Sequence, residues 1–303
     1  MALNSLITLQ GTLFLLAAIG VIFRKKDIIT EPGKAVLTDL VLDLVLPCNI
    51  INSFRMEFNL TILMKFLIIL LISVLIQVGC LILSLTMYRK QLRPREKVLQ
   101  YATVCSNAGF MGNPIAEGVF GATGLMYASV YLIPQRIVMW TAGISCFTES
   151  PDRKSVIKKV ATHPCIVAVY IGLALLIFQI PLPGFLGNTI KSVGGCTTAL
   201  SMILIGTILA DVDVKTIVSK TVLFYSAIRL ILIPVLVLAG CRLFHVEALL
   251  TGISVLLAGM PAGSTTAILA AKYEGDYIFA TKCVVVSTLL SLFTIPVWCL
   301  VLA

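Results

Sequence analysis

Charge is scarce in this sequence: 12% of its 303 residues are Asp, Glu, Lys or Arg, whereas 59% are hydrophobic. A water-soluble chain of this length cannot bury so much apolar surface, which argues against a soluble enzyme and predicts an integral membrane protein. The net charge of +9 does not indicate nucleic acid. The basic residues stand in short clusters between apolar runs, which is the pattern that orients membrane proteins.

The sequence also lacks the motifs of catalysis and metal binding. It contains no HExxH, P-loop or GxSxG motif, so we expect a protein that is not an enzyme, with no catalytic residue. Its two histidines, His163 and His245, are far apart, and its nine cysteines include no CxxC pair. Cysteines scattered through apolar runs are typical of small buried hydrophobes. We therefore expect no metal site, no disulfide framework and no cofactor.

Apolar runs of about 20 residues, the length that spans a bilayer, fill most of the chain. The first run has no basic start and no clear cleavage site, so we expect a retained helix rather than a signal peptide. The pattern predicts an all-α polytopic membrane protein of ten transmembrane helices. The predicted spans are 4–23, 34–54, 60–88, 97–118, 122–147, 164–180, 187–210, 220–244, 247–271 and 277–302.

Basic residues gather in alternate loops, after the odd-numbered spans. Cytoplasmic loops carry the excess of Lys and Arg, so these loops are predicted to be cytoplasmic and both termini extracytoplasmic. That arrangement requires an even number of spans, as ten provides. The basic loop positions lie within 24–34, 89–97, 153–159, 215–220 and at 272.

Ten spans divide into two sets of five, and an odd number of spans gives the second set the opposite orientation. That is the topology of an inverted repeat, which is common in secondary transporters. We predict a first five-helix repeat at 1–148, a cytoplasmic linker at 149–163 and a second, inverted repeat at 164–303. The fourth and ninth spans then correspond to each other.

The fourth span is interrupted by polar residues at Cys105–Gly118, which reads CSNAGFMGNPIAEG. Proline breaks or kinks a helix, and broken backbone at membrane depth is tolerated only where it is buried or lines a watery cavity. Asn113 before Pro114 has the pattern of an N-cap followed by proline at the first helical position, so we expect a half-helix to start there. Asn107, about two turns earlier, can donate and accept hydrogen bonds in the same cavity.

The ninth span carries a matching interruption at Gly259–Thr266, GMPAGSTT, and a second half-helix should start near Pro261. Paired half-helix starts present free N–H groups and partial positive charge, which favours an anion, whereas the carbonyl ends could coordinate a cation. The alternative is that glycine and proline only kink packed helices. A further break at Pro47 brings in Asn49. The predicted site residues are Asn49, Asn107, Gly112, Asn113, Pro114, Pro261, Gly263 and Ser264.

Charged residues inside predicted spans are costly and are usually paired or functional. Asp43, Arg136 and Arg229 are expected in the cytoplasmic half of the membrane, and Glu117 lies just past the first interruption. One reading is a neutralised Asp–Arg pair. The others are an arginine that attracts an anion, or a coupling proton on Asp43 or Glu117. Polar and aromatic residues of the fifth span are open to path-lining or packing roles: Tyr127, Tyr131, Gln135 and Trp140.

Four stretches resemble the auxin efflux carrier family, which contains the plant PIN proteins and bacterial organic-acid carriers. They read AAIGVIFRKKDIITEPGKAVLTDLVLDLVLPCNIINSF, SNAGFMGNPIAEGVFG, QRIVMWTAG and AGMPAGSTTAILAAKYEGD. The second places the family's crossover asparagine on Asn107 and its proline on Pro114. The fourth places the second crossover proline on Pro261.

The resemblance implies a ten-helix carrier in which helices 4 and 9 cross at the substrate site and one helix bundle moves in an elevator-like way. This chain lacks the long cytoplasmic loop of the large plant members and has Ala262 beside the second proline. A small carboxylate such as malate or malonate, carried across a bacterial inner membrane, is therefore favoured over auxin. A coupling proton or sodium ion and a homodimer are compatible with this reading.

Two other functions remain open from the sequence. One is a cation/proton antiporter or sodium-coupled symporter of the same fold, for which Glu117 is the acid near the first interruption. The other is a membrane sensor or intramembrane enzyme, although neither a signalling domain nor a catalytic motif is found in the sequence.

Overall fold

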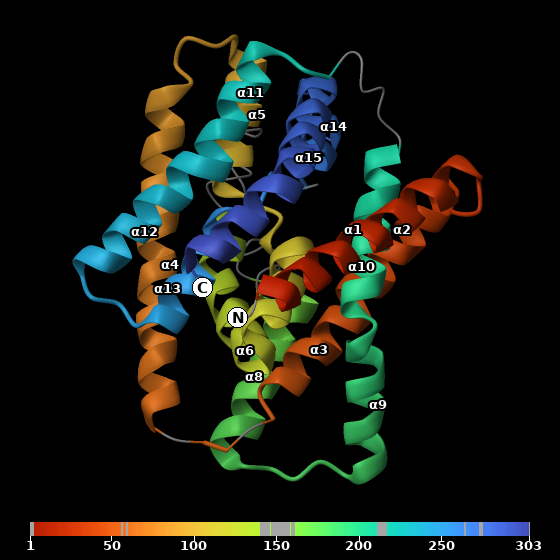
Figure 1. Cartoon of the computed structure of the whole chain (residues 1–303), viewed down its shortest axis with the longest axis vertical. Coiled ribbons are helices and arrows are strands. Elements are labelled where there is room, and N and C mark those ends of the chain that lie inside the picture. The colour runs from red at the N-terminus through yellow and green to blue at the C-terminus, as the bar shows by residue number, and fades with distance from the viewer. Residues whose placement is uncertain are drawn as a thin grey trace. The chain divides into compact units, whose positions relative to one another are not determined.

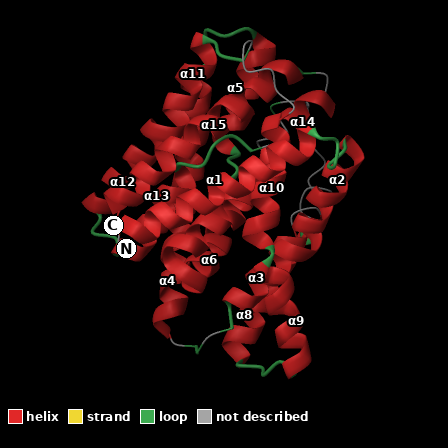
Figure 2. Ribbon diagram, turned by 45° about the vertical axis from the view of Figure 1, so that its right-hand side comes forward, coloured by secondary structure: helices red, strands yellow, loops and turns green. Residues whose placement is uncertain are grey.

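The structure is a computed structural model that describes residues 3–55, 57–58, 60–139, 146, 158, 161–210, 217–263, 265–272 and 275–302. Every regular element in these ranges is a helix (Figure 2). The helices gather in two compact units. Unit 1 comprises Met1–Leu67, Asn113–Val130 and Ala161–Val212, and unit 2 comprises Ile68–Gly112, Tyr131–Val160 and Asp213–Ala303. Each unit therefore combines parts of both sequence halves.

Six helical stretches of the described chain are long and apolar enough to cross a membrane. Two shorter apolar helices, Pro164–Phe178 and Ala248–Ala258, accompany them. The integral membrane prediction is confirmed at this level, and the arrangement as ten spans in two repeats stays a prediction. The six stretches are Glu31–Ser53, Leu60–Met87, Ala108–Val138, Gly184–Ala210, Lys220–Leu243 and Tyr277–Leu302.

Unit 1 is built around a close crossing of α1 and α10 (Figure 1). Gly20 and Gly206 face each other there, and a Cβ atom on either would press on a backbone carbonyl of the other helix, that of Ile203 or Ala17. Small residues let membrane helices approach closely, and these two glycines allow that approach. The elements of unit 1 are α1 (Leu3–Lys25), α2 (Glu31–Leu40), the π-helix η1 (Val41–Val45), α3 (Leu46–Ser53), α8 (Pro164–Phe178), α9 (Gly184–Gly195), α10 (Thr197–Ala210) and residues 113–130 of α6 (Asn113–Val138).

Helix α3 packs against both α8 and α9. A Cβ atom on Gly172 of α8 would lie 2.5 Å from the ring of Phe54, and one on Gly194 of α9 would lie 2.9 Å from the Cα of Asn49. The absence of a side chain at these two glycines lets α8 and α9 approach α3 closely. The backbone around Asn49 is therefore fixed by packing in unit 1.

Unit 2 contains the two interrupted spans. Arg95, in the first turn of α5, and Asp276, just before α15, form an ion pair at 3.2 Å. Deeper in the unit, the Tyr225 hydroxyl donates to the carbonyl of Ala102 at 3.0 Å. The elements are most of α4 (Leu60–Met87), α5 (Arg93–Val104), η2 (Ala108–Gly112), residues 131–138 of α6, α11 (Lys220–Ala227), η4 (Ile228–Leu232), α12 (Ile233–Leu243), α13 (Ala248–Ala258), α14 (Thr265–Lys272) and α15 (Tyr277–Leu302).

The π-helices η1, η2 and η4 are each followed, two residues later, by a proline: Pro47, Pro114 and Pro234. Proline lacks the N–H that bonds four residues back and its ring crowds that carbonyl, and a widened π turn is one way to accommodate both effects. Because Pro234 has no N–H, it cannot donate to the carbonyl of Leu230, four residues earlier. That carbonyl instead accepts a hydrogen bond from the indole N–H of Trp298 at 2.9 Å. The sequence thus explains the position of each widened turn.

The first interruption falls within the predicted stretch Cys105–Gly118, but at its first residue rather than near Asn113. Helix α5 ends at Val104, and the extended residue is Cys105 (φ −112°, ψ 90°), whereas Gly112 and Asn113 continue a helical path. The prediction of Asn113 as an N-cap is wrong, because the π turn absorbs Pro114 without a new helix start. Gly121, with φ 68° and ψ −162°, divides α6 at the boundary that separates the predicted fourth and fifth spans.

Candidate functional site

The two interruptions lie side by side in unit 2. Ser106 and Ala262 form an isolated antiparallel bridge. The Asn107 N–H donates to the carbonyl of Pro261 at 2.8 Å, and the Gly263 N–H donates to the carbonyl of Cys105 at 3.0 Å. Backbone groups freed by breaking two helices therefore satisfy each other, as buried backbone in a membrane requires.

Close contact between these segments depends on two predicted site residues. A Cβ atom on Gly263 would lie 3.1 Å from the Cys105 carbonyl oxygen, and one on Gly112 would lie 2.6 Å from a methyl carbon of Leu257. A larger residue at Gly263 would press on the backbone of the other interruption, whereas one at Gly112 would require the Leu257 side chain to shift.

Arg229, on the π-helix η4, holds the same two segments from the side. Its side chain is 3% exposed. Its Nε–H donates to the carbonyl of Met260 at 2.9 Å, and its Nη1–H donates to the carbonyl of Thr103 at 3.0 Å. The arginine thus bonds to the carbonyl ends of two half-helices, rather than to Asp43 as in the predicted Asp–Arg pair.

Two polar side chains complete the support of the interruptions. The carboxamide of Gln135 brackets Ser106: its Oε1 accepts from the Ser106 hydroxyl at 3.0 Å, and its Nε2 donates to the Ser106 carbonyl at 2.8 Å. The Ser287 hydroxyl accepts the N–H of Ala262 at 3.1 Å. Each member of the bridge therefore has a side-chain partner from a neighbouring helix.

The buried charges of the described chain are all positive. Arg136 is 8% exposed and Arg229 is 3% exposed, and no other charged side chain is buried among the residues whose burial the structure describes. One Nη atom of Arg136 would lie 3.6 Å from a Cβ atom on Gly109, so its guanidinium lies beside η2. The region of the interruptions is consequently suited to a negative ligand.

Two buried polar groups of unit 2, near the half-helix starts, mark the candidate binding surface. Asn107 is 6% exposed, and Thr266, in the first turn of α14, is fully buried and its hydroxyl has no hydrogen-bond partner among the described residues. Asn113 belongs to unit 1, where it is fully buried and both of its side-chain amide atoms have no hydrogen-bond partner among the described residues. A buried polar atom without a partner is costly, and a polar ligand would relieve that cost. Ser264 falls outside the described residues.

Two other residues singled out from the sequence, Asn49 and Glu117, form a hydrogen-bonded pair in unit 1. The Nδ2 of Asn49 donates to the Oε2 of Glu117 at 2.7 Å, linking α3 to α6. Asp43, on η1, is exposed. The structure therefore brings Asn49 and Glu117 together in unit 1, and Asn107, Gly112, Pro261 and Gly263 together in unit 2.

Sequence reasoning missed most of the supporting residues. Ser106 lies inside the predicted interruption Cys105–Gly118 and Thr103 lies two residues before it, but neither residue type indicates such a role by itself. Gln135 was noted only as a path-lining option, and Ser287 lies in an ordinary apolar span. A polar residue with an amide or hydroxyl in the middle of a span is the signal that could have flagged them.

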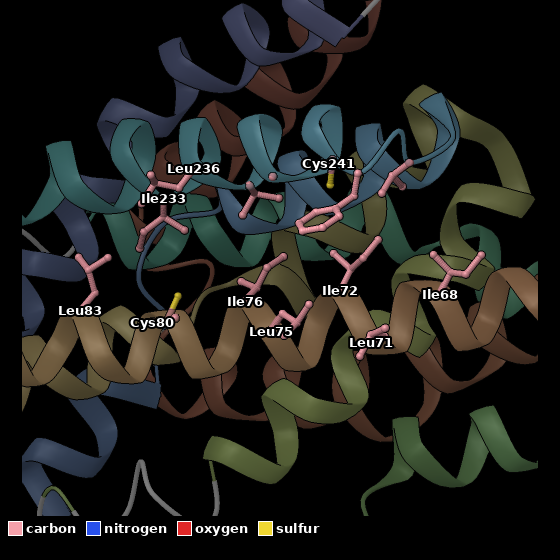
Figure 3. Close-up of a pocket in the computed structure, with 15 residues that line it drawn as sticks. Ile68, Leu71, Ile72, Leu75, Ile76, Cys80, Leu83, Ile233, Leu236 and Cys241 are labelled. Atoms are coloured by element: carbon pink, nitrogen blue, oxygen red, sulfur yellow. The ribbon is translucent and has the colours of Figure 1, made fainter.

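A groove of about 550 Å³ runs between α4 and α12 in unit 2 (Figure 3). Its lining is apolar, with side chains such as Ile72, Ile76 and Leu236 and the glycines Gly79 and Gly240. It contains none of the predicted site residues, and it offers no polar group to orient a charged substrate.

The sequence was compared with known protein families. The family described as "Membrane transport protein" matches residues 9–158 and 151–299. This chain belongs to that family. The resemblance to the auxin efflux carriers is thereby confirmed, and so is membership of a transporter family.

Two archaeal relatives of this membrane transport protein carry the same general description. An uncharacterized transporter of Methanothermobacter thermautotrophicus is 27% identical over 205 residues, 67% of each chain. An uncharacterized transporter of Methanocaldococcus jannaschii is 23% identical over 296 residues, 94% of each chain.

Proposed function

We propose that this membrane transport protein is a secondary carrier of small organic anions, with carboxylates such as malate or malonate as the substrate class. The observation that carries the proposal is the sign of the buried charge. Arg136 and Arg229 are both buried beside the paired interruptions of unit 2. Buried cations close to half-helix starts favour an anionic ligand and disfavour a cationic one.

In the proposed mechanism the anion binds near Asn107 and the start of α14, at the midplane of the membrane. The predicted fourth and ninth spans, 97–118 and 247–271, cross there, and access alternates as one helix bundle moves in an elevator-like way. The bridge between Ser106 and Ala262 supports this reading, because it keeps both interruptions together as one body. We place the carrier in a bacterial inner membrane with both termini outside, and a homodimer is compatible with this arrangement.

The test is uptake of labelled carboxylates into liposomes that contain the purified protein, with Asn107→Ala as the site variant. We expect saturable uptake of at least one carboxylate and its loss in Asn107→Ala. Asn188→Ala is the matched control, because Asn188 is an exposed asparagine on α9. Full activity of Asn107→Ala would overturn the site assignment, and binding without any transport of the carboxylate would favour a sensor.

A second candidate is proton-coupled transport through Glu117. Its carboxylate has the neutral amide of Asn49 as a hydrogen-bond partner, an arrangement that can exist with or without a proton on the acid. This candidate predicts that uptake driven by a pH gradient is lost in Glu117→Gln, whereas exchange of anion for anion persists. Gradient-driven uptake at the wild-type rate in that variant would exclude Glu117 as the coupling group.

A further inference from the structure

Arg229 meets two negative helix ends at once. Thr103 lies in the last turn of α5 and Met260 lies just beyond α13, and the guanidinium donates one hydrogen bond to each carbonyl. A helix carboxyl end carries about half a negative charge, so two such ends amount to about one. The single positive charge of the guanidinium therefore matches both ends together.

The two helix ends explain how the charge of Arg229 can be buried, which would otherwise cost free energy. A charged side chain at membrane depth is rare and needs a partner, and Arg229 is 3% exposed. The planar guanidinium presents its donors in a fixed fork, which suits two acceptors on different segments. Arg229 lies in the widened turn η4, which comes just before Pro234. Widened turns of this kind often occur at functional sites.

We propose that Arg229 is a positioning residue of the substrate site, acting as a built-in counter-ion for the carbonyl ends of both interrupted helices. The inference rests on the proposed function and deepens it. Because the guanidinium neutralises the negative ends, the partial positive charge at the starts of the two following half-helices is left for the substrate. The carbonyl ends then need no metal cation, and one carboxylate group balances the starts.

The same contacts set the geometry of the site. Three links join segment 103–107 to segment 260–263: two direct hydrogen bonds between backbones, and one bridge through Arg229, which donates one hydrogen bond to each segment. Loss of the arginine removes this bridge and leaves two buried carbonyls with one donor fewer each. The positions of the Asn107 and Gly263 N–H groups should then loosen.

The experiment compares uptake and thermal unfolding of wild type, Arg229→Ala and Arg229→Lys in liposomes and detergent. Because two hydrogen bonds from a charged donor are lost, we expect Arg229→Ala to lose carboxylate uptake by at least about tenfold. Millimolar guanidinium should restore part of that uptake and raise the unfolding temperature of Arg229→Ala, with neither effect on wild type. Arg242→Ala is the control, because Arg242 is an exposed arginine near the end of α12.

Arg229→Lys keeps the charge but not the fork, and it covers the case in which Arg229→Ala does not fold. We expect a folded protein with an unfolding temperature close to wild type and a raised KM for the carboxylate. An unchanged KM in Arg229→Lys, or a folded Arg229→Ala that guanidinium neither activates nor stabilises, would overturn the proposal. Absence of carboxylate uptake by wild type would instead overturn the proposed function, and the guanidinium effect on unfolding would still decide the role of Arg229.

Discussion

The N–H of Gly263 donates to the carbonyl of Cys105 at 3.0 Å, and a Cβ atom on Gly263 would lie 3.1 Å from the same oxygen. The bond and the close approach depend on each other. Alanine at this position must lengthen the bond or move the backbone, and overpacking of this kind costs about 1–3 kcal/mol. A single methyl group on Gly263 therefore requires the Cys105 backbone to move away from it.

We expect Gly263→Ala to lower carboxylate uptake and the unfolding temperature together. Gly79→Ala on α4 is the matched control, since a Cβ atom there would meet nothing within 4 Å. Uptake and unfolding temperature should be measured on both variants in parallel. Equal behaviour of the two alanines would show that the close approach does not limit the site.

A second prediction concerns the carboxamide of Gln135, which exchanges two hydrogen bonds with Ser106. Gln135→Leu leaves a buried hydroxyl and carbonyl with fewer partners, at a cost of about 1–3 kcal/mol. Ser106→Ala removes one of the same bonds, so the two substitutions should be less than additive. Thermal unfolding of both single variants and the double variant measures the coupling, and strict additivity would contradict it.

The contact between Trp298 and the Leu230 carbonyl gives a third prediction. Trp298→Phe should destabilise unit 2 by about 1 kcal/mol or more, because the carbonyl that Pro234 leaves over loses its donor. In a Pro234→Ala background a backbone N–H becomes available for that carbonyl, so the cost of Trp298→Phe should shrink. Unfolding temperatures of the four proteins in this cycle provide the measurement. The same loss in both backgrounds would rule out the link to proline.

A fourth prediction tests the crossing of α1 and α10 in unit 1. Gly206→Ala places a methyl group against the carbonyl of Ala17 and should lower the unfolding temperature. Gly195→Ala, where a Cβ atom meets open space, should be neutral or slightly stabilising, because alanine favours a helix by about 0.5–1 kcal/mol over glycine. Opposite signs for the two alanines are the expected result, measured in the same detergent. A stabilising Gly206→Ala would mean that the helices separate easily.

Much of the helix layout follows from apolar run length and from proline. The predicted spans 60–88 and 277–302 correspond to α4 at Leu60–Met87 and α15 at Tyr277–Leu302. The half-helix start expected near Pro261 is found at Thr265, with Thr265 and Thr266 in its first turn. These features depend on the length of apolar runs and on the position of proline, both of which can be read from the sequence.

The place of the break within Cys105–Gly118 could not be predicted, because two local rules competed. An Asn-Pro pair fits a helix start, but it also fits a continuous helix with a widened turn ahead of the proline, and the structure takes the second course at Asn113 and Pro114. The partner of Arg229 was hidden for a different reason. Its acceptors are backbone carbonyls of Thr103 and Met260, and backbone groups carry no sequence signal.

The indole of Trp298 can also serve as a fluorescent probe of the paired interruptions. The chain contains only two tryptophans, Trp140 and Trp298. Replacing Trp140 with phenylalanine would leave a single emitting indole, hydrogen-bonded to the residue next to Arg229. Emission from that indole depends on its hydrogen bond and on nearby charge. Fluorescence of the single-tryptophan protein would therefore test, without any added label, whether a carboxylate binds at the paired interruptions.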